Sequence, residues 1–244
     1  MKKKYYYDLH THSCLSPCGD NDMTPGNMAG MGVVAGLDIM ALTDHNSTLN
    51  CPAFEQAAEG YGIVPVPGME LTTAEDIHLV CLFESTQDAM EFNARVNGHR
   101  IFVKNKTAIF GNQFIMDGSD EITGEEEYLL PNATTITIDE APALVSEYGG
   151  VCYPAHIDRE SNGIIATLGT FPDSPPFPCA EIHSSEKTEE LREKYPVLKD
   201  KPVIISSDAH YLGDINGRQN YIELDCDGTP EGVRKALIRG LKGI

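Results

Sequence analysis

The 244-residue sequence predicts an α/β fold, a (βα)7 TIM-like barrel that forms one domain over residues 1–244. Seven short apolar runs alternate with helix-start signals, which indicates a mostly parallel sheet. The length lies within the range of a single α/β barrel. A composition of 41% hydrophobic and 23% charged residues is typical of a globular chain.

Each expected strand is a short apolar run that is long enough to cross a core and too short for a buried helix. The seven runs are Tyr5–Leu9, Ile39–Thr43, Ile63–Val66, Ile77–Phe83, Val151–Pro154, Ala180–Ile182 and Val203–Ser206. Helix starts lie between or after them, where a capping side chain precedes proline or an acidic residue. These starts are Thr24-Pro25, Asn50-Cys51-Pro52, Ser85 with Asp88, and Thr229-Pro230.

One segment, from about residue 98 to 131, does not follow the strand and helix alternation. It contains Gly111, Gly118 and Gly124 and the acidic run at 125–127, without a steady hydrophobic period. We expect an insertion or lid between the fourth and fifth strands. The acidic run is expected to be a solvated face without chemistry of its own.

The charge and the cysteine content limit which binding partners and which cellular compartment we expect. Thirty-seven acidic and 18 basic residues give a net charge of -19, which disfavours binding to duplex nucleic acid and to anionic membranes. No run of about 18 apolar residues is present, and no apolar stretch follows the basic start as in a secretory signal. Seven cysteines without framework spacing suit a reducing compartment, so we expect a cytoplasmic protein.

Histidines gather near the ends of the expected strands, where parallel barrels build their sites. Six of the eight follow this pattern: His10, His12, His45, His156, His183 and His210. Several imidazoles that converge at a barrel mouth can hold a divalent metal through neutral ring nitrogens. This pattern predicts a metal site.

Two short-range pairs strengthen that prediction. His10 and His12 are two residues apart, so their side chains point to the same face of an extended chain. Asp208 and His210 repeat this spacing after the seventh strand. Closing a barrel would make the two pairs neighbours.

Glu70 and His78 are expected to form a third pair, which depends on a turn of the chain and not on close spacing. Too few residues separate them for a parallel crossover, so an antiparallel hairpin is the remaining option. The hairpin would bring His78 back to Glu70 at the same barrel end. A carboxylate has two oxygens, so Glu70 can bridge two ions.

The histidines and acids lie in motifs whose order resembles the PHP (polymerase and histidinol phosphatase) family. The motifs are His10-Thr11-His12-Ser13, Thr43-Asp44-His45, Gly68-Met69-Glu70, Ile77-His78-Leu79, Pro154-Ala155-His156-Ile157-Asp158-Arg159 and Ser207-Asp208-Ala209-His210. The resemblance covers residues 5 to about 210 and is greatest to the stand-alone metal-dependent phosphoesterases. It implies the distorted barrel, two or three divalent metal ions (Zn, Mn or Fe) and phosphoester hydrolysis.

The resemblance also implies how the metal ligands divide. The first metal would take His10, His12, Glu70 and Asp208, and the second Glu70, His78 and His156. A third would take His45, His210 and an early ligand, for which this chain departs from the family. Asp20 is preferred as a hard oxygen donor, whereas a Cys18 thiolate would select zinc. A capping loop with only two metals bound is the alternative.

Other residues are candidates for roles around the metals. Asp44 is expected to orient an imidazole or a metal-linked water. Arg159 is expected to clamp the substrate phosphate, with a salt bridge to Asp158 or Glu160 as the alternative. His183 is expected to bind substrate or donate a proton, with a structural role as the alternative.

These observations predict an enzyme, a metal-dependent phosphoesterase in which Glu70, Asp208 and His183 serve catalysis and a metal-activated hydroxide attacks. No GxSxG elbow, P-loop or dinucleotide-binding motif is present. The expected partner is a small-molecule phosphomonoester or short nucleotide, without duplex nucleic acid or membrane. The alternatives are an exonuclease of the same family on single-stranded oligonucleotides and a non-catalytic metal-binding domain.

Overall fold

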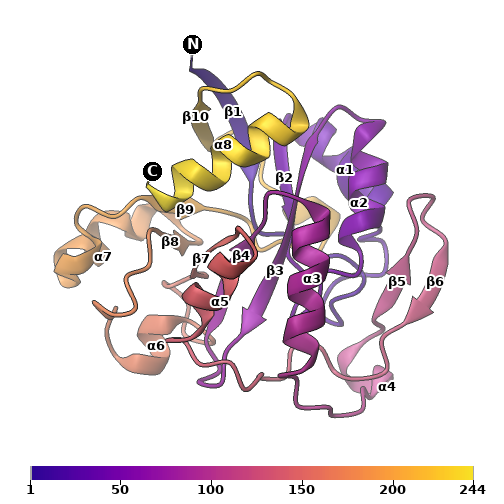
Figure 1. The fold of residues 1–244 in the computed structure, drawn as a ribbon, viewed down its shortest axis with the longest axis horizontal. Helices are drawn as coiled ribbons and strands as arrows, with labels where there is room; N and C mark the ends of the chain where they lie inside the picture. Colours follow the sequence, from indigo (N-terminus) through magenta and orange to yellow (C-terminus); the bar gives the residue numbers. More distant parts are fainter. Residues whose placement is uncertain (1, 244) are drawn as a thin grey trace.

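A curled six-stranded sheet forms the centre of the molecule, which the computed structural model describes for residues 2–243 (Figure 1). Its strand order is β10-β1-β2-β3-β4-β7. The strands are β1 (Lys3–Asp8), β2 (Ile39–Leu42), β3 (Val64–Thr72), β4 (His78–Leu82), β7 (Val151–Pro154) and β10 (Tyr221–Leu224). β1, β2 and β3 are parallel, whereas β4 is antiparallel to both of its neighbours and β10 is antiparallel to β1.

A separate parallel pair, β8 (Ala180–Ile182) and β9 (Val203–Ile205), continues the curl. Isolated contacts connect this pair to the main sheet. Ile157 N–H donates to the Glu181 carbonyl at 2.9 Å, and His12 N–H donates to the Ala209 carbonyl at 3.0 Å. The result is a mixed α/β fold with an incomplete barrel, less regular than the expected (βα)7 arrangement.

All seven expected strands are present within a few residues of their expected bounds. The hairpin inferred for Glu70 and His78 is present as β3 and β4, in which Thr72 pairs with His78. β2, β3, β4, β7 and β8 are buried along their whole length. Burial on both faces explains why these strands are mostly apolar, with polar exceptions such as Glu70, His78 and Glu181.

The helices surround the sheet, and all four expected starts are correct. The helices are α1 (Pro25–Ala35), α2 (Cys51–Glu59), α3 (Thr86–Asn97), α4 (Thr107–Phe110), α5 (Ala141–Glu147), α6 (Ile164–Leu168), α7 (Thr188–Lys194) and α8 (Pro230–Lys242). Side chains of Thr24, Ser85 and Thr229 accept backbone hydrogen bonds at the starts of α1, α3 and α8. Each cap satisfies a donor that the helix itself leaves free.

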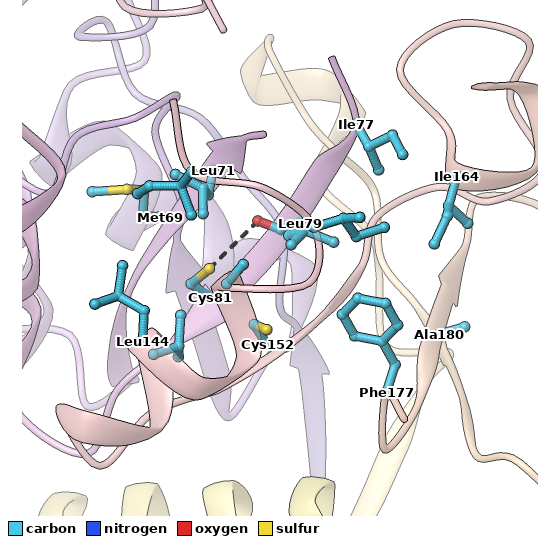
Figure 2. Packing of buried hydrophobic residues seen from close by; sticks show 14 of the residues in the cluster. Met69, Leu71, Ile77, Leu79, Cys81, Leu144, Cys152, Ile164, Phe177 and Ala180 are labelled. Atoms are coloured by element: carbon cyan, nitrogen blue, oxygen red, sulfur yellow. Dashed lines mark hydrogen bonds between the residues drawn. The ribbon is translucent and has the colours of Figure 1, made fainter. Parts of the chain in front are cut away.

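Two sides of β4 pack into different parts of the core. Leu79 and Cys81 contact residues of α3, α5 and the 164–182 region (Figure 2). Val80 and Leu82 face the inside of the curl with Val233 and Leu237 of α8. Alternation along a strand accounts for this division.

Helix α8 covers the end of the sheet where the parallel strands begin. Arg234 of α8 donates to the Pro65 carbonyl at the start of β3, and Lys242 donates to the Gly149 carbonyl before β7. Figure 1 shows α8 at the top and the arrowhead of β3 pointing away from it. The opposite end, where β1, β2 and β3 finish, is left for a site.

Residues 98–131 contain α4 and a hairpin of β5 (Phe114–Met116) and β6 (Ile122–Glu125) at the right of Figure 1. The hairpin lies against the loop after β1, where Phe114 N–H donates to the Cys14 carbonyl at 3.0 Å. Gly111 has φ 99°, and a Cβ there would lie 2.1 Å from the Pro17 carbonyl oxygen. The role of this segment as an insertion or lid remains a prediction. Within residues 2–243, no helix is both long and apolar enough to span a membrane.

Candidate metal centre

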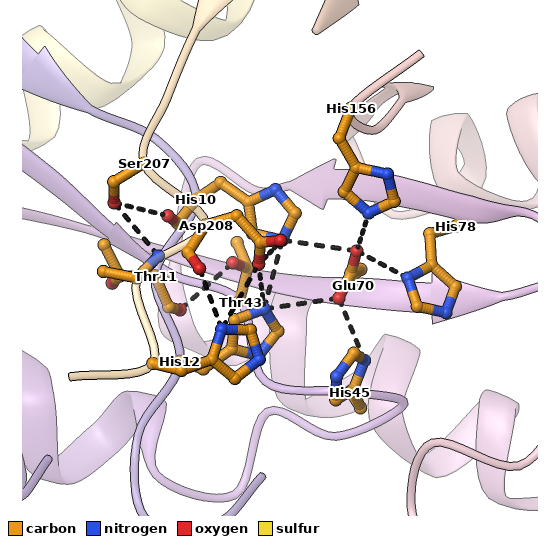
Figure 3. Close-up of polar contacts among 12 residues, drawn as sticks. His10, Thr11, His12, Thr43, His45, Glu70, His78, His156, Ser207 and Asp208 are labelled. Atoms are coloured by element: carbon orange, nitrogen blue, oxygen red, sulfur yellow. Dashed lines mark hydrogen bonds and ion pairs between the residues drawn. The ribbon is translucent and has the colours of Figure 1, made fainter. Parts of the chain in front are cut away.

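The expected metal ligands converge where the parallel strands end, around the carboxylate of Glu70 (Figure 3). His10 and His12 follow β1, His45 follows β2, His78 begins β4, His156 follows β7, and Asp208 and His210 follow β9. All of these side chains are buried except that of His210, which is partly exposed. Residues from opposite ends of the chain therefore form one cluster.

Three overlapping sets of ligand atoms can each hold a cation, and within each set the atoms lie within 4.8 Å of one another. The sets are His10, His12, Glu70 and Asp208; His45, Glu70 and His78; and His12, His45 and His210. The first is the set that the family resemblance implies. His156 completes the surroundings of Glu70, with Nε2 at 3.1 Å from Oε1.

Spacing within the first set fits a bound ion. His10 Nε2 lies 3.3 Å from Glu70 Oε1 and 3.3 Å from Asp208 Oδ1. His12 Nε2 lies 3.0 Å from Asp208 Oδ1 and 3.1 Å from His10 Nε2. Ligands at about 2.1 Å from a tetrahedral zinc ion are separated by roughly 3.4 Å. The four side chains are thus preorganised for a divalent cation.

Unpaired polar atoms at the centre give an independent indication. His45 Nδ1 and Glu70 Oε2 lie 2.9 Å apart, yet neither makes a hydrogen bond within the described residues. His156 Nδ1 is also buried without a partner there. A buried polar atom without a hydrogen bond is costly, and a metal ion would satisfy the atoms beside Glu70. The residues present therefore fit divalent cations.

Ser16 and Asp44 orient the ring of His12. Ser16 Oγ lies 3.0 Å from His12 Nδ1 and donates to Asp44 Oδ1 at 2.7 Å. With its own proton committed to Asp44, the hydroxyl accepts from Nδ1–H and leaves the Nε2 lone pair of His12 for a metal. Asp44 also accepts from Ser13 N–H and Ser13 Oγ. These contacts agree with the orienting role expected for Asp44.

Glu181 of β8 plays the corresponding part for His10, and sequence reasoning missed it. Glu181 Oε1 lies 2.8 Å from His10 Nδ1 and accepts from His156 N–H at 3.1 Å. It therefore orients one expected ligand and fixes the backbone of another. The only sequence signal was an acidic residue within an apolar, buried strand.

Asp8, at the end of β1, is a second buried acid that sequence reasoning missed. It accepts from Ser207 N–H and Asn216 N–H, both at 3.0 Å. These bonds fix the loop that carries Asp208, which has φ 53°. His156 has φ 29°, so two expected ligands adopt a left-handed backbone that only the surrounding contacts maintain.

The charges in the cluster are strongly coupled. Burial opposes ionisation of Glu70, but the imidazoles of His78, His10 and His45 outweigh it and hold the pKa of Glu70 well below its ordinary value. Burial also opposes protonation of His12, whereas Asp208 and Glu70 raise its pKa to about 9. A cation binding at these atoms replaces protons, so acid weakens metal binding.

His45 and His210 behave differently, because burial dominates at both. Burial lowers the pKa of His45 to about 3 and that of His210 to about 4, and the nearby His12 adds to both effects. His210 Nδ1 lies 2.8 Å from the Asp208 carbonyl, to which it donates. Both imidazoles are therefore neutral near pH 7, the form that binds a metal.

Arg159 and His183 lie at the mouth of the cluster. Arg159 pairs with Asp208 rather than with Asp158 or Glu160, and its Nη2 lies 3.4 Å from His183 Nδ1. Arg159 lines a cavity of about 150 Å³ over Glu70. Arg159 and His183 both line a second cavity of about 500 Å³ next to it. Both side chains thus have access to a ligand.

Asp20 and Cys18 do not join any of the three ligand sets. The Asp20 carboxylate accepts from Asp22 N–H at 2.9 Å, which commits it to its own loop. Cys18 is exposed. In the third set, His12 stands beside His45 and His210 instead of the expected early ligand, and Asp20 as a ligand remains a prediction.

Comparison with known proteins supports the resemblance seen in the motifs. The sequence model of the PHP domain matches residues 8–126. A 5'-3' exoribonuclease of Haemophilus influenzae is 34% identical over 94 residues, which are 37% of this chain and 32% of that protein. A 5'-3' exoribonuclease of Salmonella typhimurium is 32% identical over 81 residues, which are 31% of this chain and 27% of that protein. The match thus spans about a third of these relatives.

Solved structures share the fold. The lesion-specific endonuclease EndoQ of Pyrococcus furiosus gives a TM-score of 0.64 at 14% identity, covering 99% of this chain and 56% of that one. Endonuclease Q in complex with a 27-mer duplex gives 0.63 at 16%, covering 99% and 57%. A proposed metal-dependent phosphoesterase of Bifidobacterium adolescentis gives 0.60 at 19%, covering 94% and 96%. At these identities the likeness concerns the fold alone.

The names of these proteins overturn one expectation. Net charge led us to expect a small-molecule partner and to exclude duplex nucleic acid, but the curated relatives are exoribonucleases and one structural neighbour is bound to a duplex. The expectation was wrong because net charge averages over the whole surface, whereas a nuclease needs favourable contacts only along the path of its substrate.

Proposed function

From the match of residues 8–126 to the PHP domain family, we propose that this chain is a metal-dependent hydrolase of phosphodiester bonds in nucleic acid. The observation that carries the proposal is a cluster of three overlapping ligand sets, two of which share the buried carboxylate of Glu70. Proteins use clustered divalent cations of this kind to activate water and to neutralise a phosphoryl group. The nuclease names of the relatives support the choice of substrate.

Two or three ions of the Zn, Mn or Fe type suit the donors, which are imidazole nitrogens and carboxylate oxygens. His10, His12, Glu70 and Asp208 would hold the first ion. Glu70 and His78, which form a ligand set with His45, would hold the second together with His156, whose Nε2 lies 3.1 Å from Glu70. His45 and His210 would hold a third, completed by the loop at Asp20, because the free Nε2 of His12 serves the first ion. The bound ions would supply Lewis acidity to the scissile phosphate.

Arg159 has the position to bind a non-bridging phosphate oxygen. It lines both cavities at the mouth of the cluster, and its side chain is 37% exposed although it pairs with Asp208. A phosphate can compete for this group because guanidinium binds phosphate and carboxylate in the same bidentate geometry. Arg159 would therefore orient the substrate.

His183 is the candidate proton donor for the leaving oxygen. Its exposed ring lies 3.4 Å from Arg159, and its backbone N–H donates to Asp158 at 2.8 Å. The backbone bond fixes the residue while the ring stays accessible. A general acid must reach the leaving group directly or through one water.

Action on the end of a single strand is the mode that we favour. Among the described residues, Arg159 is the one arginine or lysine that lines the two cavities at the mouth of the cluster, so the site itself offers few phosphate contacts beyond the metals. An exonuclease needs to hold only the last nucleotides. Few contacts also predict an unusually weak dependence of binding on salt.

The test begins with metal analysis of the purified protein. Oligonucleotides labelled at either end, single-stranded and duplex, are then incubated with Zn²⁺, Mn²⁺ or Fe²⁺. We expect stepwise release of mononucleotides from one end, and loss of both bound metal and activity in His12→Ala. A protein that binds metal but cleaves none of these substrates would refute the proposal.

A further inference from the structure

The larger cavity beside the metal cluster has a volume of about 500 Å³ and is continuous in its lining with the proposed site. Arg159, Asp208 and His210 border this cavity and also the one of about 150 Å³ over Glu70. The smaller space can take a phosphate, whereas the larger has the size of pockets that hold small organic ligands. A group attached to the phosphate can therefore enter it.

We propose that this cavity binds the nucleoside attached to the scissile phosphate, with the base stacked on Tyr211. The inference rests on the proposed nuclease function and adds to it the recognition of a planar base. Tyr211 lines the cavity directly after His210, an expected metal ligand.

The ring of Tyr211 has no partner of its own within the described part of the protein. Its side chain is 55% exposed, and within residues 2–243 it makes no ring contact or hydrogen bond. An aromatic ring exposed to water beside a phosphate site offers a stacking surface for any base.

Two polar side chains complete the wall. Asp214 and Asn216 line the cavity, and within the described part of the chain their side chains make no hydrogen bond. A carboxylate accepts hydrogen bonds, whereas an amide both donates and accepts. Together they can pair with a base edge or with sugar hydroxyl groups.

The wall is fixed before any ligand arrives. Asp214 N–H donates to the Tyr211 carbonyl at 3.0 Å, and Asn216 N–H donates to the buried Asp8 at 3.0 Å. Ile215, between them, is buried in the core. A rigid backbone reduces the entropy lost on binding.

Fluorescence of 2-aminopurine reports stacking directly. A short single-stranded oligonucleotide with this base at one end, and another with it at the other end, carry hydrolysis-resistant phosphorothioate linkages. We expect the wild-type protein to quench one of them. Tyr211→Leu should abolish the quenching and weaken binding by about 5- to 150-fold, which is the usual contribution of one stacked base. Tyr211→Phe should retain both.

Two controls isolate the contact. Tyr61→Leu removes another ring that is 51% exposed and should change nothing. An oligonucleotide with an abasic terminal sugar should bind the wild-type protein and Tyr211→Leu equally. Equal losses for the normal and abasic strands, or quenching that survives in Tyr211→Leu, would overturn the inference.

Hydrolysis of the corresponding unmodified strand separates this inference from the proposed function. Quenching by Tyr211 without hydrolysis would refute the function and leave the base site standing. Hydrolysis together with unchanged binding in Tyr211→Leu would refute the base site and leave the proposed function standing. Absence of both binding and hydrolysis would refute both.

Discussion

Neutralising Glu181 should weaken metal binding although this residue is not itself an expected ligand. Its carboxylate is 1% exposed, and Oε1 lies 2.8 Å from His10 Nδ1 while also accepting from His156 N–H. Burial opposes protonation of His10, but nearby carboxylates raise its pKa well above the ordinary value. Glu181 makes the largest of these contributions. It therefore increases the basicity of a ring whose Nε2 faces the metal site.

The magnitude follows from these two contacts. Removing a carboxylate that orients a metal-bound histidine typically costs 10- to 100-fold in metal affinity, or about 1.4 to 2.7 kcal/mol. Glu181→Gln keeps an oxygen for both donors and loses only the charge, so we expect about tenfold. Glu181→Ala leaves both donors unpaired and should approach about 100-fold.

Competition with a chromophoric chelator measures the affinity, and circular dichroism checks that each variant is folded. Glu186→Gln is the matched control, because this glutamate is exposed a few residues further along the chain. NMR titration should show a lower pKa for His10 in Glu181→Gln. Unchanged affinity in both folded Glu181 variants would refute the assignment of His10 as a ligand supported by Glu181.

Three further predictions concern other parts of the molecule. His12→Ala should reduce the number of bound metal ions, measured by mass spectrometry, and abolish hydrolysis; full metal content would contradict its place in the ligand sets. Arg159→Ala should keep the metal but lower kcat/KM by about 10- to 100-fold, through loss of a charged phosphate contact of about 1.5 to 3 kcal/mol; an unchanged kcat/KM would exclude the clamp. Burial raises the pKa of Tyr7 to about 12, so stability that is complete below the unfolded pKa of about 10 should fall by about 2.7 kcal/mol as the pH rises to about 12. Tyr5 and Tyr153, whose pKa values are also raised, titrate in both proteins, so urea unfolding should show a fall that is smaller in Tyr7→Phe than in the wild type. Equal falls would contradict the prediction.

Much of the fold could be predicted because its signals are local. Runs such as Ile39–Leu42 are apolar throughout since both faces are buried, and caps such as Thr24 lie next to the helices that they begin. β10 was not predicted. Of its residues, Tyr221–Leu224, Leu224 alone is buried, and the run includes the charged Glu223. The strand exists because it pairs with β1, more than 200 residues away.

In the site, too, some residues could be predicted from local sequence and others could not. The close spacing of His10 and His12 and the short hairpin between Glu70 and His78 could be interpreted without knowing the fold. Glu181 and Asp8 could not, because a buried acid has meaning only once its partners are known. Asp20 was chosen by counting along a loop, but the path of that loop depends on a hydrogen bond to the His210 carbonyl.

Placement of ligands from residue 10 to residue 210 has a consequence for synthesis and assembly. While the chain is emerging from the ribosome, His10 and His12 must wait for Asp208, about 200 residues later, before the first cage can close. Cations bound by the complete ligand set would link the chain after β1 to the chain after β9. Chelation should therefore loosen the seam between β1 and β9, and a nascent chain arrested before Asp208 should retain metal poorly.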